Sequence, residues 1–295
     1  MSDDRGPVVH QHLLMRALIA LRHENGLTQQ QVARDLDWSH AKMMRYENCQ
    51  QVLPRAELDA LLVEYGVASA PLARDLRALG EAARRPVWWA PYRCLLTADQ
   101  RIYFGLEAGA DTIRQVATYV LPDLLQTRDY ARCIAAARAE PWQVHSLVEM
   151  VMRRQAALGS RSSRPRQRYL LSEAVLRIHV GVEVDPSIMV RQLHHLVEAA
   201  AAPEVQIRVL PHAHGEHLAL VYGLFTLVGF GEVGLEEVFH AQSGHMSLLT
   251  SKKSDVGPYP GAFEEAWELA LPEDASVRLI SDRRAHLDAA HAELR

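Results

Sequence analysis

Side chains that can read the edges of DNA base pairs stand together between positions 40 and 45. These residues are His40, Ala41, Lys42, Met44 and Arg45. Lysine and arginine donate hydrogen bonds to guanine, and an alanine methyl can contact the methyl group of thymine. Polar residues that could hold a helix against phosphate oxygens precede them, namely Thr28, Gln29 and Ser39. Such side chains can act together only if one helix presents the first group to the major groove.

Two short helices joined by a turn are predicted around these residues. Thr28 can cap the first helix, because its hydroxyl can accept a hydrogen bond from a backbone N–H two or three residues on. Ser39 can cap a second helix over residues 40–47, on which Met43 and Tyr46 share one face. We expect these two side chains to face the interior and the polar ones to point outward. This is the helix-turn-helix plan, whose second helix lies in the major groove.

The order of residues here resembles the xenobiotic-response-element type of helix-turn-helix, the kind found in phage repressors. The matching residues are Gly26, Leu27, Thr28, Gln29, Ala33, Leu36, Ser39, Met43, Arg45 and Glu47. Asp37 and Cys49 depart from the pattern, because that type commonly has glycine at these positions. Aspartate tolerates a left-handed backbone better than most residues, so we expect the turn to form. The alternative is an ordinary pair of amphipathic helices in a bundle.

The charge of the chain argues mildly against tight DNA binding by a single copy. The chain has 32 lysines and arginines against 36 aspartates and glutamates, a net charge of −4, and residues 1–85 are balanced. Phosphate contacts usually dominate affinity for DNA. We therefore expect segregated charge and a homodimer as the species that binds double-stranded DNA.

Composition excludes several other classes of protein. A hydrophobic fraction of 48% and a charged fraction of 23% are ordinary for a soluble globular chain. No apolar stretch reaches the ~18 residues of a membrane helix, and the N-terminus lacks the pattern of a secretory signal. Three distant cysteines, Cys49, Cys94 and Cys133, suit neither a zinc motif nor a disulfide framework. We expect a cytoplasmic protein without membrane contact, metal or cofactor.

The length of 295 residues suggests about two domains. Residues 1–85 predict an all-α, five-helix, repressor-like helix-turn-helix domain. Its expected helices are 10–24, 28–36, 40–47, 54–65 and 71–84. Residues 86–95 predict a linker, because two prolines flank Trp88 and Trp89. The tryptophan rings could form a wall for a ligand or for stacked bases, but packing on the following domain is favoured.

Residues 96–295 mix helical and strand patterns and predict an α+β domain for sensing, dimerisation or partner binding. The expected strands are 112–121, 168–171, 205–210, 218–228, 238–241 and 246–250. The expected helices are 99–110, 127–137, 142–158, 185–200, 261–271 and 273–290.

This half resembles an uncharacterised domain that follows a helix-turn-helix in antitoxin-like transcriptional regulators of high-GC Gram-positive bacteria. The blocks that carry the resemblance are 121–132, 153–158, 170–181, 192–200, 205–211 and 223–228. Asp123 departs from it, because the family usually has glycine there. The resemblance implies regulation of transcription, often with a small companion protein encoded nearby, and it supplies no ligand.

Two clusters could support other chemistry. His212, His214 and His217, with Glu216 between them, could hold a metal ion, although solvated loop histidines are the favoured interpretation. The run from Arg153 to Arg168 has six arginines and no acidic residue. It could contact phosphates or an acidic partner, or it could be a solvated loop.

The sequence therefore predicts a sequence-specific DNA-binding transcriptional regulator, not an enzyme, that works as a homodimer and answers to an unknown effector or partner. An antitoxin-like protein that binds a small companion, with mainly autoregulatory DNA binding, is the first alternative. A metal-assisted enzyme that uses residues 212–217 is the second.

Overall fold

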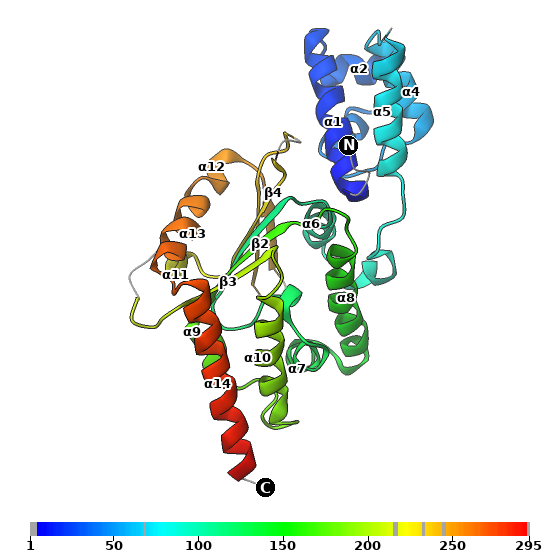
Figure 1. Cartoon of the computed structure of the whole chain (residues 1–295). Coiled ribbons are helices and arrows are strands. Elements are labelled where there is room, and N and C mark those ends of the chain that lie inside the picture. Colours follow the sequence, from blue (N-terminus) through cyan, green and yellow to red (C-terminus); the bar gives the residue numbers. More distant parts are fainter. Residues whose placement is uncertain (1–4, 68, 215–217, 232–233, 244–245, 294–295) are drawn as a thin grey trace. The chain divides into compact units, whose positions relative to one another are not determined.

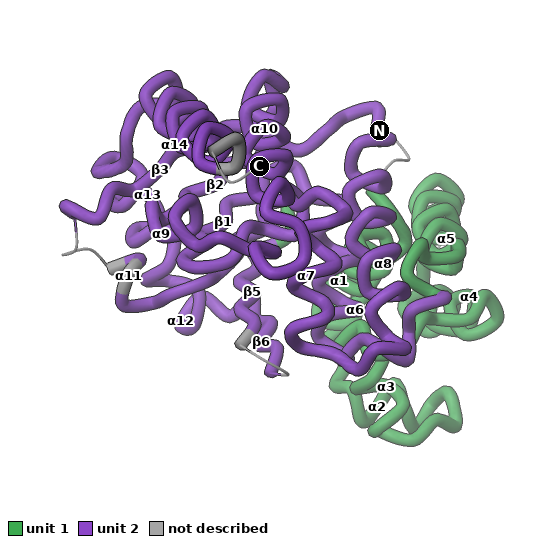
Figure 2. The backbone as a smooth tube through the Cα atoms, turned by 90° about the horizontal axis from the view of Figure 1, so that it is seen from below, with its two compact units in different colours: residues 1–90, 232–235 green, residues 91–231, 236–295 purple. Residues whose placement is uncertain are grey.

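The chain forms two compact units in the computed structural model (Figures 1 and 2). Residues 1–90 and 232–235 make up the first unit, and residues 91–231 and 236–295 make up the second. The structure describes residues 5–67, 69–214, 218–231, 234–243 and 246–293. Within these ranges, no helix is both long and apolar enough to cross a membrane.

The first unit is all-α, as predicted. Its helices are α1 (Gly6–Glu24), α2 (Gln29–Asp35), α3 (His40–Glu47), α4 (Arg55–Glu64) and α5 (Ala70–Ala83). α1 begins four residues earlier than expected, because Pro7 in its first turn is well suited to start a helix. Gly26 and Gly66 follow α1 and α4 with φ of 67° and 61°, backbone angles that favour glycine.

Apolar side chains from all five helices share one core in this unit. Its largest fully buried members include Leu14, Met43, Tyr46 and Leu58. Gly80 lets α5 approach this core closely, because a Cβ atom at that position would lie 2.7 Å from Cδ2 of Leu58. The core thus fixes the depth at which α3 sits against the rest of the unit.

The second unit is built on a six-stranded mixed sheet with the order β3-β2-β1-β4-β5-β6. Its strands are β1 (Thr112–Ala117), β2 (Arg166–Ser172), β3 (Val205–Leu210), β4 (Phe225–Gly229), β5 (Val238–Ser243) and β6 (Met246–Thr250). β1 pairs in parallel with β2, and β2 with β3. The remaining neighbours are antiparallel. β1 therefore lies at the junction of the parallel and antiparallel halves.

Helices cover both faces of this sheet (Figure 1). The helices of the second unit are α6 (Ala98–Ala108), α7 (Arg128–Arg138), α8 (Pro141–Gly159), α9 (Glu173–Arg177), α10 (Ser187–Ala199), α11 (Leu218–Tyr222), α12 (Lys253–Val256), α13 (Pro258–Leu269) and α14 (Glu273–Glu293). Side chains of α7, α10 and α14 share one core with the sheet. Those of α11 and α13 share another. The predicted α+β class is confirmed.

One predicted strand of the second unit is wrong. Residues 218–228 do not form a single strand, because Leu218–Tyr222 is the helix α11 and only the end of the stretch belongs to β4. Gly223 separates the two elements with a φ of 71°. An uninterrupted apolar run is compatible with a buried helix as well as a buried strand, so periodicity alone misassigned it. β1 also ends at Ala117 rather than at Leu121.

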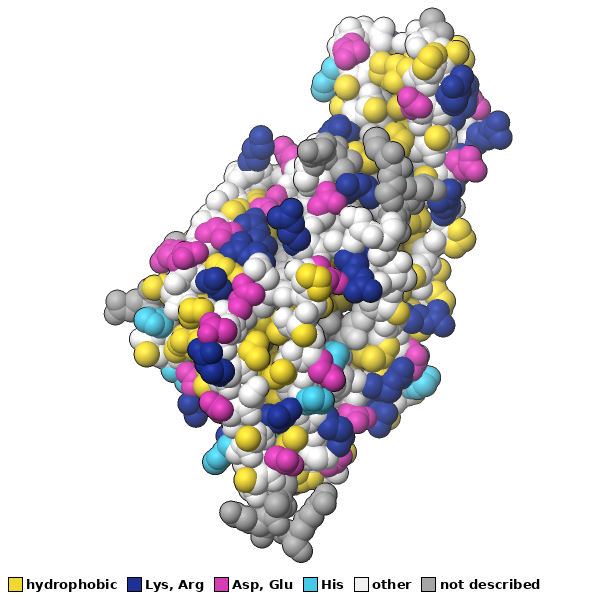
Figure 3. Space-filling model, viewed as in Figure 1, with side chains coloured by type: hydrophobic (Ala, Val, Ile, Leu, Met, Phe, Trp, Pro, Cys, Tyr) yellow, Lys and Arg dark blue, Asp and Glu magenta, His cyan; other side chains and the backbone are white. Residues whose placement is uncertain are grey.

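The arginines between positions 153 and 168 do not form one surface. Arg154 is buried against Glu107, and Arg161 is buried and donates to the backbone oxygen of Ala110 at 2.5 Å. Because Arg154 and Arg161 are buried, they belong neither to a phosphate-contacting surface nor to a solvated loop. On the face seen in Figure 3, basic and acidic side chains are interspersed rather than separated.

Gln192 links α10 to the start of α7 and gives the first test of the fold. The side chain is fully buried, its Oε1 accepts from the Thr127 N–H at 2.7 Å, and its Nε2 donates to the Leu125 oxygen at 2.7 Å. Gln192→Leu keeps the size but leaves the buried Leu125 oxygen and the partly buried Thr127 N–H without a partner, so the free energy of unfolding should fall by roughly 2–4 kcal/mol. Urea unfolding followed by circular dichroism measures this.

Glu198→Leu is the matched control, because Glu198 lies on an exposed position of the same helix. We expect it to change the free energy of unfolding by less than about 0.5 kcal/mol. Equal effects of the two substitutions would contradict the role given to Gln192.

Candidate nucleic-acid interface

α3 presents one face to the core and the other outward. The hydroxyl of Ser39 caps it by accepting from the Lys42 N–H at 3.2 Å. Met43 and Tyr46 are 2% and 1% exposed. The predicted base-contacting residues that are exposed are His40, Ala41, Met44 and Arg45. The division of this helix into an inner and an outer face is as the spacing of its residues predicts.

Lys42 is not brought together with those four residues. Its Nζ lies 2.7 Å from Oε1 of Glu57 on α4 and 4.4 Å from the centre of the Trp38 ring. The hydroxyl of Tyr46 donates to the same carboxylate. Glu57 thus holds the ammonium group of Lys42 beside the body of the domain. The sequence instead predicts that Lys42 contacts a base.

The turn between α2 and α3 uses a left-handed residue that is not glycine. Asp37 has a φ of 54°, and Cys49, just after α3, has a φ of 55°. These are the two positions at which the sequence lacks an expected glycine. Each backbone angle is strained for a residue with a Cβ atom, and the rest of the domain holds both in place.

Asp37 gives a test of this strain, because its side chain is exposed. Asp37→Gly removes the steric cost of the left-handed angle, and we expect it to stabilise the domain by about 1 kcal/mol, seen as a higher melting temperature. Asp37→Ala removes the same carboxylate but keeps the Cβ atom, so it should give no stabilisation. A rise in melting temperature with alanine would attribute the effect to charge instead.

A buried ion pair ties α1 to the end of α3. Nε and Nη2 of Arg22 donate to the two carboxylate oxygens of Glu47 at 2.6 and 3.0 Å, and Nη1 donates to the Leu27 oxygen at 2.8 Å. Both side chains are less than 10% exposed. This two-pronged contact fixes direction as well as distance. Arg22 therefore positions the recognition helix and the segment that enters α2.

Two glutamines extend this arrangement. The Gln29 amide donates to Oε2 of Glu47 at 2.5 Å, so this partly exposed side chain, which was predicted to hold phosphate, is bonded to Glu47. Buried Gln11 on α1 donates to the backbone oxygens of Cys49 and Gln51 at 3.1 and 3.0 Å. These bonds fasten the chain that leaves α3.

The sequence patterns described above predict no role for Arg22 or Gln11. The position of Arg22 nevertheless indicates that it is buried, because it follows Leu14 and Leu18 at four-residue steps on the apolar face of α1. A charge on such a face needs a buried partner. Nothing in the spacing identifies Gln11, whose partners are backbone atoms about forty residues away.

Glu47→Leu should therefore be severely destabilising, because it leaves the Arg22 guanidinium buried without a counter-charge. We expect a loss of about 3–5 kcal/mol in the free energy of unfolding. The double variant Arg22→Met/Glu47→Leu removes both charges and should recover much of that loss. Thermal and urea unfolding of both variants test this, and a double variant less stable than Glu47→Leu would contradict it.

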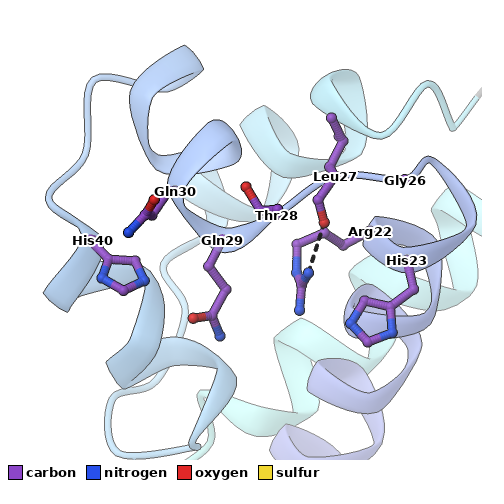
Figure 4. A pocket seen from close by; sticks show the side chains of 8 residues that line it. All are labelled: Arg22, His23, Gly26, Leu27, Thr28, Gln29, Gln30 and His40. Atoms are coloured by element: carbon purple, nitrogen blue, oxygen red, sulfur yellow. Dashed lines mark hydrogen bonds between the residues drawn. The ribbon is translucent and has the colours of Figure 1, made fainter.

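A shallow depression of about 650 Å³ lies beside these contacts (Figure 4). His23 and His40 stand on opposite sides of it, and Arg22 and Gln29 point between them. Thr28 lines the depression and caps α2, accepting from the Gln31 N–H at 3.2 Å while Oε1 of Gln31 accepts from the Thr28 N–H at 2.8 Å. Thr28, Gln29 and His40 thus line the same depression, and Ser39 directly precedes His40 in the chain.

Burial changes the acidity of two groups behind α3. The pKa of the Tyr46 hydroxyl is raised by burial and by its hydrogen bond to Glu57. Burial raises the pKa of the Cys49 thiol to about 12. Both groups thus stay protonated, and neither adds a negative charge beside the outward face.

The histidine cluster in the second unit is only partly described. His212 and His214 are exposed, and His217 and Glu216 lie outside the described residues. Among the residues that are described, no group of three or more histidines, cysteines, aspartates or glutamates is placed to hold a metal ion. The metal hypothesis for residues 212–217 stays untested.

Comparisons with known protein families agree with this geometry. Residues 14–76, which contain α2, α3 and most of their supporting helices, match the family described as "Helix-turn-helix domain". The first unit is thus a helix-turn-helix domain, the class found in DNA-binding regulators. Residues 100–282, more than half of the chain, match the "Domain of unknown function (DUF5753)".

The chain belongs to the DUF5753 family, and its two matched regions together are those of a helix-turn-helix transcriptional regulator. No curated protein and no solved structure matches it.

Proposed function

We propose that this regulator reads a specific DNA sequence by placing α3 in the major groove. The observation that carries the proposal is the division of α3 described above. Met43 and Tyr46 hold the helix from behind, while its opposite face is free of the domain core. A helix buried on all sides could not enter a groove, and one without an anchor could not be held at a fixed angle.

Base contacts are assigned to the exposed residues His40, Met44 and Arg45, with the Ala41 methyl next to a thymine. Arg45 is the strongest candidate, because among the described residues its side chain makes a single long hydrogen bond, 3.5 Å from Nε to Oε1 of Gln51. Lys42 joins them only if DNA draws its ammonium group away from Glu57. Phosphate contacts are assigned to Thr28, Gln29 and Ser39, on or next to the depression. Gln29 makes such a contact only if DNA draws its amide away from Glu47.

Within the helix-turn-helix class, we propose the xenobiotic-response-element type. In support, the residues that resemble its pattern have distinct structural roles: Thr28 and Ser39 cap helices, Ala33 and Met43 are buried, and Glu47 binds Arg22. The balanced charge of residues 1–85 favours a homodimer, because two copies double the phosphate contacts.

The antitoxin-like alternative would add a small protein partner to the same DNA contacts, and no contact among the described residues favours it. No catalytic reaction is assigned to the chain.

Selection of binding sites from random DNA tests the proposal. We expect selected sites with two-fold symmetry, and tighter binding at low salt than at high salt. In gel shifts, Arg45→Ala should lose roughly 1–3 kcal/mol of discrimination at one base pair of each half-site. Gln29→Ala should weaken selected and unrelated DNA about equally, because phosphate contacts carry no sequence information.

Arg74→Ala is the control for Arg45→Ala, because it removes the same charge from an exposed position on α5. It should leave discrimination unchanged. Loss of discrimination with Arg74→Ala but not with Arg45→Ala would overturn the assignment of α3.

A further inference from the structure

The second unit contains a cavity of about 670 Å³, within the size range of small-molecule sites. One wall is the sheet face formed by β1, β4 and β5, where Gln115, Thr226 and His240 pair across neighbouring strands. The other walls include side chains of α6, α7 and α8. All the residues that line the cavity belong to the second unit, so it does not depend on the helix-turn-helix domain.

The lining of this cavity changes from its interior to its rim. Phe104, Met150 and Phe225 are buried members of the lining and supply apolar surface inside. The lining residues that are exposed, and therefore form the rim, are Thr97, Val120, Arg138 and Leu224. Arg138 is the charged member of this group. A molecule that fills the cavity therefore meets apolar surface inside and a positive charge at the rim.

The charges inside the cavity are paired with one another. Buried Arg154 donates to Glu107 through two nitrogens and to Asp123 at 3.0 Å, and the Tyr103 hydroxyl donates to Glu107 at 2.7 Å. Two carboxylates thus share one guanidinium. A ligand anion placed beside them would gain no free cation and would be repelled by the excess negative charge.

The imidazole of His240 adds no charge to the interior. Its ring stacks on the Tyr103 ring with centres 3.8 Å apart, and its Nε2 lies 3.0 Å from Oγ of Ser247. Burial, together with the charge of Arg154, lowers the pKa of His240 to about 3. The imidazole is therefore neutral at physiological pH, and the interior offers no counter-charge to an anion.

Arg138 differs from the other charged side chains of the lining. It is the last residue of α7, and its guanidinium has no hydrogen bond or ion pair among the residues that the structure describes. The other two arginines of this helix, Arg128 and Arg132, pair with Glu149 and Asp129. A guanidinium can bind a carboxylate through two parallel hydrogen bonds. The charge of Arg138 is thus available to a ligand in the cavity.

We infer that this cavity binds a small molecule with an apolar body and one carboxylate, which pairs with Arg138 at the rim. The apolar body packs against the buried rings inside, and the excess negative charge beside Arg154 keeps the carboxylate away from the interior. The ligand is therefore bound in one direction, with its carboxylate outward. Binding does not require DNA, so the inference stands or falls independently of the proposed function.

Two matched probes test this with the full chain in the absence of DNA. 1-Naphthaleneacetate carries a carboxylate at neutral pH, and 1-naphthaleneacetamide has the same ring system with an uncharged amide. By isothermal titration calorimetry, the unaltered chain should bind the carboxylate about tenfold more tightly, as expected for a charge-assisted contact at an exposed rim. Added salt should reduce this preference, because it screens exposed charges.

Arg138→Met removes the guanidinium and keeps an apolar stem. It should bind the two probes with similar affinity, and its affinity for the amide should equal that of the unaltered chain. Arg132→Met is the matched control, because Arg132 is exposed on the same helix and lies outside the lining. It should keep the tenfold preference for the carboxylate.

Leu147→Trp places a larger side chain in a half-buried part of the lining and should weaken binding of both probes at least tenfold. Circular dichroism checks that each variant folds, and the comparison of Arg138→Met with Arg132→Met decides the matter if Leu147→Trp does not. The inference is overturned if the unaltered chain fails to bind 1-naphthaleneacetate or binds both probes equally. A preference that survives Arg138→Met, or one that Arg132→Met also removes, overturns it as well.

Discussion

The ion pair between Arg22 and Glu47 is the contact on which the geometry of the helix-turn-helix rests. It joins the last turn of α1 to the last turn of α3 and, through Gln29, to the first turn of α2. Apolar packing of Met43 and Tyr46 fixes how deep α3 sits, but packing alone allows a short helix to rotate. The two-pronged bond restricts that rotation, so the outward side chains keep their directions.

The helix-turn-helix could be predicted because its signals are local. Hydroxyl caps at Thr28 and Ser39 mark both helix starts, and a three-residue spacing identifies the inner face of α3. The orientation of Lys42 could not be predicted, because Glu57 reaches it from the next helix. Side-chain pairing between elements depends on how they pack, and no pattern within one helix records it.

In the second unit, the class of fold followed from the sequence but the sheet order did not. A strand such as β3 could be located by its alternating side chains, whereas its neighbours are set by tertiary packing. The same limit applies to side chains that share one face of the sheet. Gln115, Thr226 and His240 are unremarkable polar residues in three separate segments, and only the register of the sheet brings them into one row.

The sheet order also determines which contacts can form first while the chain is being synthesised. Among the described residues, the buried core of the first unit draws on positions up to Leu76, with Leu79 packed against it, so its contacts can form as soon as that segment has left the ribosome. β1 instead waits for β4, about a hundred residues later in the chain. Distant pairings of this kind slow folding. Until β4 arrives, one edge of β1 lacks its partner, and the nascent sheet is then most exposed to aggregation.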